Sequence, residues 1–454
     1  MSTVRLSRTE KFLTLFTKVQ PGEGPCIGLL CLQAFVLMAA YYLIRPVREA
    51  FILTEGGAEL RNYAVGAQAL LLILIIPAYG ALVRRVDASL VFQRVCVFFA
   101  LNLVLLVLLG KAGMRLGFVF FIWASIFGVM AVTQFWAFAI DLLNVKSGHR
   151  LLGVIAVGIS CGAWIGSRLA AAGFESIGPY GLMLASAAAL VGAAFLSQRA
   201  RSRVPAGSRG IDDEHRRAAS GSPLQQRLGG FAVIARSRYL VYIAALVVLL
   251  NWITSAGEYV LSDWLVETAR RESPGGEAVF IGRFMANYGA SITLLGFLIQ
   301  LLLVSRIILF AGIVRALMVT PIAFLAGYLL IGIVPLFALV QSVLIVQRSL
   351  DYSLLNTTRS ALLLPTSREA KYQAKTAIDT FFYRMGDLLA TLSVCVGLKL
   401  FAEPRMQIVW LILILSATMT LIAWLIGREY ARRYGAGRND AALGADTGGM
   451  VLQR

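Results

Sequence analysis

The chain has 454 residues, of which 58% are hydrophobic and only 15% are charged, and its net charge is +18. About a quarter of the residues of a soluble protein are charged, so this composition excludes soluble enzymes, secreted disulfide scaffolds and disordered chains. It predicts an all-α polytopic membrane protein. The five cysteines lie in apolar runs without paired spacing and the two histidines lie in loops, so we expect no metal site, no cofactor and no enzymatic activity.

One crossing of a bilayer by an α-helix takes about 20 mostly apolar residues. Twelve segments of the sequence meet this criterion, and they fall into two groups of six on either side of a long hydrophilic stretch. This is the expected arrangement of a two-bundle secondary transporter. The predicted spans are 24–43, 64–82, 89–109, 116–140, 151–171, 178–197, 239–262, 284–304, 316–334, 335–354, 376–398 and 406–426.

The hydrophilic segments between the spans carry unequal charge. Most of the 42 Lys and Arg residues fall in the N-terminal segment, in the loops after even-numbered spans and in the C-terminal segment. Basic loops stay in the cytoplasm, so both termini are expected to be cytoplasmic and no nucleic-acid partner is expected. The predicted parts are a tail (1–23), a six-helix bundle (24–197), a basic linker (198–238), a second six-helix bundle (239–426) and a second tail (427–454).

Ionisable residues within or beside a span are costly in lipid and usually face a protein interior or a wet cavity. The first group stands in the segment "IRPVRE", with Arg45, Arg48 and Glu49. Guanidinium groups suit phosphate or carboxylate ligands, so Arg45 and Arg48 are candidate substrate-binding residues and Glu49 is their candidate charge partner. The alternative is that both arginines cap the span at the outer interface and pair with Glu49.

The second group stands at the end of the fourth span. Asp141 closes this span, and Lys146 and Arg150 follow in the next loop. We expect Asp141 to pair with one of these two cations as an inner gate. The alternative is an ordinary anchor at the inner membrane interface.

Three glycines in the fifth span, Gly158, Gly162 and Gly166, are spaced by four residues. Small residues at this spacing let two helix backbones approach closely. They predict a packing seam and not a ligand site.

The seventh span contains Glu258 within an apolar stretch. It is a candidate counter-ion for an arginine, a candidate proton carrier or a candidate ligand for a substrate hydroxyl, and we include it among the substrate-binding candidates. The alternative is a purely structural pair with an arginine inside the membrane.

The last group leads into the eleventh span. Lys375 and Asp379 are four residues apart and can share one helix face. Arg384 lies deeper in the apolar run, about 140° around a straight helix from Asp379. Lys375 and Arg384 are candidate substrate-binding residues and Asp379 is a candidate charge partner. The alternative for Lys375 is a solvated loop charge.

Four segments together resemble the ATP/ADP translocase family of nucleotide transporters, and more closely its shorter, major-facilitator-like bacterial relatives. They are "YYLIRPVREAF" (41–51), residues 133–167, "GEYVL" (257–261) and residues 351–387. The resemblance implies exchange of nucleoside di- and triphosphates across a bacterial inner membrane. It also implies that Arg45, Arg48, Lys375 and Arg384 contact the phosphates. No Walker-type phosphate loop occurs, so an ATP-driven pump is not expected.

These observations predict a secondary transporter that moves a small anionic solute, by resemblance a nucleotide, by alternating access. One rival is a proton-coupled carrier of another anion, such as a siderophore, a peptide or a sugar phosphate. The other is a membrane interaction protein that transports nothing and whose buried charges are structural.

Overall fold

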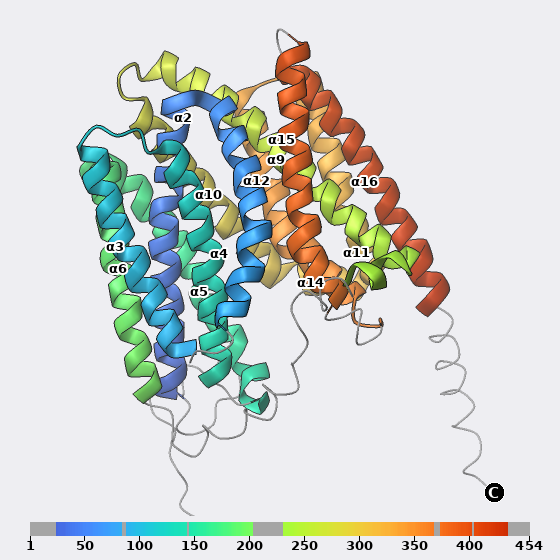
Figure 1. Cartoon of the computed structure of the whole chain (residues 1–454). Coiled ribbons are helices and arrows are strands. Elements are labelled where there is room, and N and C mark those ends of the chain that lie inside the picture. Colours follow the sequence, from blue (N-terminus) through green and yellow to red (C-terminus); the bar gives the residue numbers. More distant parts are fainter. Residues whose placement is uncertain are drawn as a thin grey trace, which may run out of the picture. The chain divides into compact units, whose positions relative to one another are not determined.

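The computed structural model describes residues 24–83, 88–142, 145–202, 230–366, 373–401 and 404–434, all but short turns of which are helical (Figure 1). The predicted N-terminal tail lies outside the described residues, as do most of the C-terminal tail and most of the linker. The chain divides into two compact units. The first comprises Met1–Ser220 and Ser262–Leu294, and the second comprises Gly221–Leu261 and Leu295–Arg454.

The first unit begins with a long helix that two glycines break. The helix α2 covers Gly24–Val83, but Gly57 has a φ of 64° and Gly56 a φ of −153°. The left-handed φ at Gly57 is one that residues with a Cβ avoid, and it separates the first two predicted spans. The helix continues unbroken through Pro46, so "IRPVRE" lies within a helical segment. The unit continues with α3 (Ala88–Lys111), α4 (Gly117–Leu142), α5 (Val145–Ser176) and α6 (Gly178–Ser202).

The segment before this break also fixes the start of α4. The carboxylate of Glu55 accepts hydrogen bonds from the backbone N–H groups of Leu116 and Gly117 at 2.8–2.9 Å. Helix N-termini leave several N–H groups unsatisfied, and a carboxylate there also interacts favourably with the helix dipole. Glu55 therefore caps the start of α4.

The predicted glycine seam joins α5 to the first half of α2. A Cβ on Gly158 would lie 2.6 Å from the backbone oxygen of Cys31, and one on Gly166 would lie 2.8 Å from the Cα of Ala39. Gly162 approaches the backbone of Phe35 in the same way. The prediction of close helix packing at these three positions is confirmed.

The remaining described helices are interrupted by π-helical turns. They are α9 (Arg238–Glu272), α10 (Glu277–Leu302), α11 (Val304–Ile333), α12 (Phe337–Leu350), α13 (Asn356–Leu362), α14 (Lys375–Ala377), α15 (Tyr383–Leu400) and α16 (Pro404–Tyr434). The π-turn η2 (Asp351–Leu355) joins α12 to α13, and η4 (Ile378–Phe382) joins α14 to α15. Such turns often occur at functional sites.

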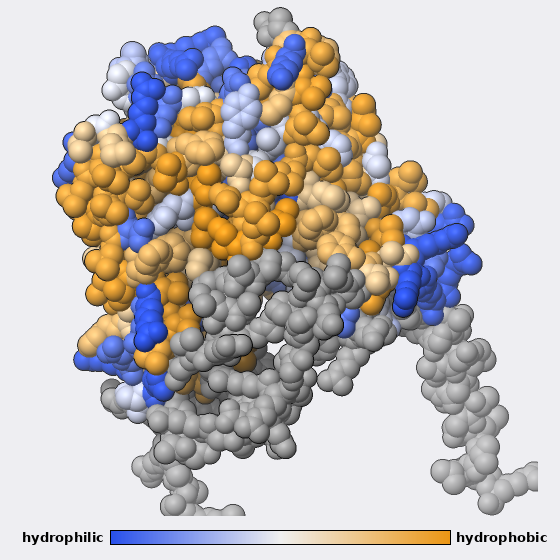
Figure 2. Space-filling view, in the orientation of Figure 1, coloured by the Kyte–Doolittle hydropathy of each residue, from blue (hydrophilic) through white to orange (hydrophobic). Residues whose placement is uncertain are grey.

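Ten helical segments of the described chain are long and apolar enough to cross a membrane. This count takes the whole of α2 as one segment and does not include α12 and α13. Many of their apolar side chains are exposed, such as Leu74 at 68% and Leu392 at 60%. Hydrophobic residues dominate much of the face shown in Figure 2. Lipid must cover such a surface, so the chain is a multi-pass membrane protein and the predicted all-α fold class is confirmed.

Candidate functional site

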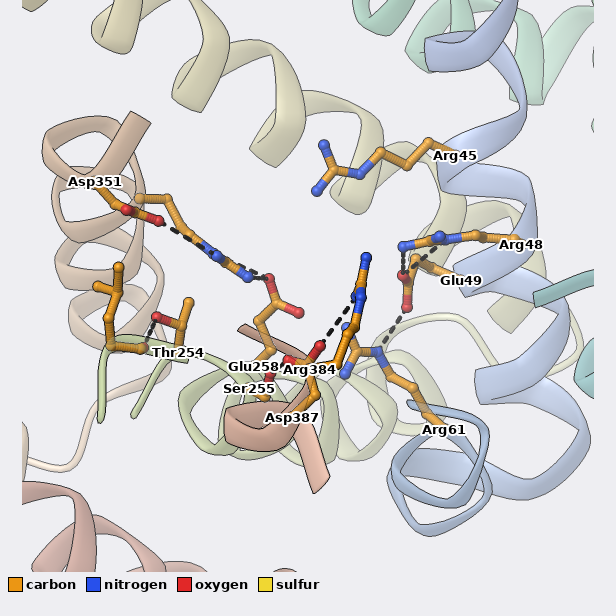
Figure 3. Close-up of polar contacts among 12 residues, drawn as sticks. Arg45, Arg48, Glu49, Arg61, Thr254, Ser255, Glu258, Asp351, Arg384 and Asp387 are labelled. Atoms are coloured by element: carbon orange, nitrogen blue, oxygen red, sulfur yellow. Dashed lines mark hydrogen bonds and ion pairs between the residues drawn. The ribbon is translucent and has the colours of Figure 1, made fainter. Parts of the chain in front are cut away.

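In the first unit, two arginines share one buried carboxylate. Oε1 of Glu49 lies 3.1 Å from Nη2 of Arg48, and its Oε2 lies 2.7 Å from Nε of Arg61. The side chains of Glu49 and Arg61 are only 7% and 5% exposed. Figure 3 shows Arg48 and Arg61 reaching Glu49 from two segments of α2. The break at Gly56 and Gly57 makes this possible, because it lets the second half of α2 turn back toward the first.

The guanidinium of Arg48 is held by more than its carboxylate. Its Nη1 donates a 2.8 Å hydrogen bond to Oγ of Ser125 on α4, and its centre lies 4.6 Å from the ring centroid of Phe121. A cation over an aromatic face is stabilised by the charge distribution of the ring. Arg48 therefore has a fixed orientation with a polar group on one side and an aromatic face on another.

Arg45 lies one helical turn before Arg48. Its Nη1 lies 3.4 Å from the hydroxyl of Tyr42, and its guanidinium lies 5.4 Å from the centroid of that ring. The side chain of Arg45 is half-buried beside this aromatic residue. Arg48, by contrast, contacts a carboxylate, a hydroxyl and an aromatic ring.

In the second unit, Glu258 of α9 pairs with Arg348 of α12. Nη1 of Arg348 also lies 3.8 Å from Oδ2 of Asp351, at the start of the η2 turn. The side chain of Arg348 is only 10% exposed. One buried guanidinium therefore stands between two carboxylates. The pairing of Glu258 with an arginine fits both the counter-ion role and the purely structural pair considered for it.

A second ion pair in this unit joins residues of one helix. Nη1 of Arg384 lies 3.0 Å from Oδ2 of Asp387, three residues further along α15. Oδ1 of the same carboxylate accepts a 2.7 Å hydrogen bond from the hydroxyl of Ser255 on α9. Figure 3 draws this pair with Arg384 extended beyond the carboxylate. The guanidinium of Arg384 also lies 5.1 Å from the ring of Tyr383.

The third acidic residue of this region, Asp379 in η4, has two cationic partners. It lies 3.2 Å from Nζ of Lys375 and 3.2 Å from a guanidinium nitrogen of Arg359. The predicted sharing of one face by Lys375 and Asp379 is confirmed. Lys375 is 42% exposed, so this pair is far less buried than those of Glu49 and Glu258.

The predicted inner gate lies outside what the structure describes. Asp141 is the penultimate residue of α4, and Lys146 and Arg150 belong to the first turns of α5. The side chains of all three lie outside the described part. Their pairing stays a prediction.

Two arginines that pair with the predicted carboxylates Glu49 and Glu258 were not identified from the sequence. Arg61 follows the glycine pair and reads as an outer-loop charge, and only its distance of twelve residues from Glu49 across a Gly-Gly break indicates a pairing. Arg348 lies inside the tenth predicted span, where an uncompensated charge is rare. Its position alone was a signal for a partner such as Glu258.

Comparison with known proteins establishes the fold. No known family profile matches the chain, and no curated protein matches it. Among solved structures, the nucleoside transporter NupG has a TM-score of 0.64 at 13% identity, covering 88% of this chain and 98% of its own. A POT family peptide transporter has a TM-score of 0.60 at 14% identity over 90% and 97% of the two chains. A bacterial homologue of the iron transporter ferroportin has a TM-score of 0.61 at 14% identity over 88% and 98%. The chain therefore has the major facilitator fold.

Proposed function

We propose that this protein is a secondary transporter that moves a small anionic solute across the membrane by alternating access. The observation that carries the proposal is the Arg48–Glu49–Arg61 cluster, in which two buried guanidinium groups share a single carboxylate. Burying ionised groups in a bilayer protein is costly, so such a cluster needs a reason. Reversible binding of a substrate anion supplies one.

Glu49 acts in this proposal as an internal substitute for the substrate. In the empty protein its carboxylate satisfies Arg48 and Arg61. A substrate phosphate or carboxylate takes over these hydrogen bonds, with Arg45 beside it, and Glu49 is released. The exchange of one set of charge-assisted bonds for another keeps the energetic cost of binding small.

The second unit contains ion pairs of the same kind. Arg384 is held by Asp387 and stays a candidate substrate-binding residue, while Lys375 and Asp379 lie at the start of the same helical run. Glu258 and Arg348 form a pair that can be opened and closed during the transport cycle. The major facilitator fold, which the nucleoside transporter NupG shares, agrees with a carrier of this kind.

We further propose that the substrate is a nucleotide, exchanged as in the ATP/ADP translocases that the four sequence segments resemble. Nucleotide exchange is tested by measuring the uptake of labelled ATP or ADP into liposomes that contain the purified protein. The liposomes are prepared with and without nucleotide in their lumen. Uptake that requires internal nucleotide supports exchange. Uptake of another anion that is abolished by collapsing a proton gradient supports the proton-coupled rival instead.

A thermal-shift screen against nucleotides and other anions tests binding without transport. A ligand present at 100 times its dissociation constant stabilises the folded state by about 2.7 kcal/mol. We expect the shift to be lost in Arg48→Gln and kept in Arg271→Gln, whose exposed ion pair with Glu267 lies within one helix. If every tested anion leaves the melting curve unchanged and no uptake occurs, the protein is not an anion transporter.

A further inference from the structure

A group of arginines lies where α9 begins and α16 ends, two places that both belong to the second unit. Nη1 of Arg433 donates a 3.3 Å hydrogen bond to Oγ of Ser237, so the two helix ends are joined. Figure 2 shows a strongly hydrophilic patch at the lower right, where α16 ends in Figure 1, directly beside hydrophobic surface. The charge distribution of the loops predicts that these helix ends lie on the cytoplasmic side.

The charge at these helix ends is strongly unbalanced. Residues 231–239 and 424–433 contain a single carboxylate, that of Glu429, and five arginines, which are Arg236, Arg238, Arg428, Arg432 and Arg433. The carboxylate of Glu429 is shared, because Oε1 lies 2.7 Å from Nε of Arg433 and Oε2 lies 3.6 Å from Nη1 of Arg432. One carboxylate cannot balance five guanidinium groups, so this surface attracts anions.

The side chain of Arg433 has a fixed orientation. In addition to its contacts with Glu429 and Ser237, its guanidinium lies 5.8 Å from the ring centroid of Tyr239. That ring is fully buried, and its hydroxyl donates a 2.9 Å hydrogen bond to the carbonyl oxygen of Leu362. The side chain of Arg433 nevertheless stays 38% exposed. A guanidinium that is already oriented and still accessible loses little conformational freedom when it binds an anion.

Five residues earlier, Arg428 lies over an aromatic ring on the outer surface of α16. Its guanidinium lies 4.7 Å from the ring centroid of Trp424, which is 47% exposed. Tryptophan is enriched where a membrane meets water, at the level of the lipid headgroups. Leu421, one turn further into the span, is 54% exposed, so lipid covers this face of the helix. The position of Arg428 is therefore that of a residue beside phospholipid headgroups.

The start of α11 adds exposed apolar side chains to the same place. A Cβ on Gly427 would lie 2.5 Å from Cγ1 of Val314, so α11 approaches α16 closely near its end. The left-handed φ of 78° at Gly312 breaks α11 just before this contact. In the segment that precedes the break, Leu309 and Phe310 are 81% and 88% exposed. Large apolar side chains this exposed indicate contact with a membrane.

We propose that the start of α9 and the end of α16 form a binding site for an anionic phospholipid. Arg428 and Arg433 hold the headgroup phosphate, and the acyl chains lie against the exposed apolar residues of α11 and α16. The planar fork of arginine matches phosphate oxygens in pairs, and basic clusters at the cytoplasmic ends of spanning helices attract anionic lipids. A zwitterionic lipid has the same phosphate, but its cationic group is repelled by the surplus arginines. The inference does not depend on which solute the protein transports.

The first test measures lipid binding directly. The full-length protein in detergent is titrated with phosphatidylglycerol or phosphatidylcholine, and native mass spectrometry gives the affinity for the first bound lipid. We expect the native protein to prefer phosphatidylglycerol. Arg428→Gln with Arg432→Gln should lower this affinity about 25-fold, because each arginine near a membrane surface contributes about fivefold.

The matched control is Arg270→Gln with Arg271→Gln, which removes the same charge at the other end of α9 and should leave the affinity unchanged. Equal binding of the two lipids by the native protein would overturn the proposal. An equal loss in both double variants would also overturn it.

The second test separates a structured site from general attraction to a charged surface. Arg433→Lys keeps the charge but removes the planar fork, and we expect it to lower the affinity for phosphatidylglycerol about two- to tenfold. Arg432→Lys, at a side chain that is 79% exposed, should not. An unchanged affinity in Arg433→Lys would refute the arginine site. Neither measurement involves uptake, so a failure of the lipid site would leave the proposed transport function standing.

Discussion

The substitution Gly162→Ala tests whether the contact between α2 and α5 is set by backbone atoms. A Cβ at this position would lie 2.8 Å from the Cα of Phe35 and 2.9 Å from its carbonyl carbon. These atoms belong to a helix and cannot rotate away as a side chain can. The two helices must therefore separate by about half an ångström or more to reach an ordinary contact distance.

The expected cost follows from two opposing effects. Overpacking a well-packed contact costs about 1–3 kcal/mol, and separation also weakens the contacts of Gly158 and Gly166. Replacing a helical glycine by alanine stabilises the helix by roughly 0.5–1 kcal/mol. We expect Gly162→Ala to lower the free energy of unfolding by about 1–2 kcal/mol net.

The matched control is Gly192→Ala in α6, where a Cβ meets nothing within 4 Å. This variant should be unchanged or more stable. Reversible unfolding of both proteins in mixed detergent micelles, followed by circular dichroism, measures the difference. If Gly162→Ala is as stable as Gly192→Ala, the close approach of α5 to α2 does not exist in the folded protein.

Three further predictions concern buried charges and backbone conformation. Glu49→Ala leaves Arg48 buried without its shared carboxylate and should destabilise the protein by about 3–5 kcal/mol. Thermal denaturation in detergent measures this loss, and an unchanged midpoint would contradict the pairing of Glu49 with Arg48 and Arg61. Arg348→Ala should have a similar cost in the same assay. The double variant Glu258→Gln/Arg348→Met should recover part of it, because a carboxylate at position 258 is no longer left without its cation; additive losses would argue against the pair. Gly57→Ala places a Cβ at a φ of 64° and should destabilise by about 1–2 kcal/mol, so a gain in stability would show that the break in α2 is absent.

The helical architecture was predictable because the bilayer imposes it. Each of the twelve predicted spans overlaps a helix, and the spacing of Gly158, Gly162 and Gly166 correctly predicted a close contact. The identity of the partner helix was not available from this spacing. Contacts between distant residues depend on how the helices pack, and a single sequence contains no direct record of them.

The charged residues were found more readily than their partners. Glu49, Glu258 and Arg384 stood out because charge is rare in apolar runs. Arg61 did not, because the Gly-Gly break makes the residues around it resemble a loop. The offset of about 140° between Asp379 and Arg384 assumed a regular α-helix, and the η4 turn between these residues invalidates that assumption.

The π-turns η2 and η4 have a consequence for how this sequence tolerates length changes. A π-turn accommodates one more residue than an α-turn, and each residue of an α-helix advances the chain by 1.5 Å and about 100°. Deleting one residue within η4 would therefore let the wide turn close to an α-turn and would leave Arg384 facing nearly the same direction relative to Lys375. The same deletion within the regular part of α15 would rotate the residues on one side of it by about 100° relative to those on the other, so η4 is the part of this helical run that best tolerates the loss of a residue.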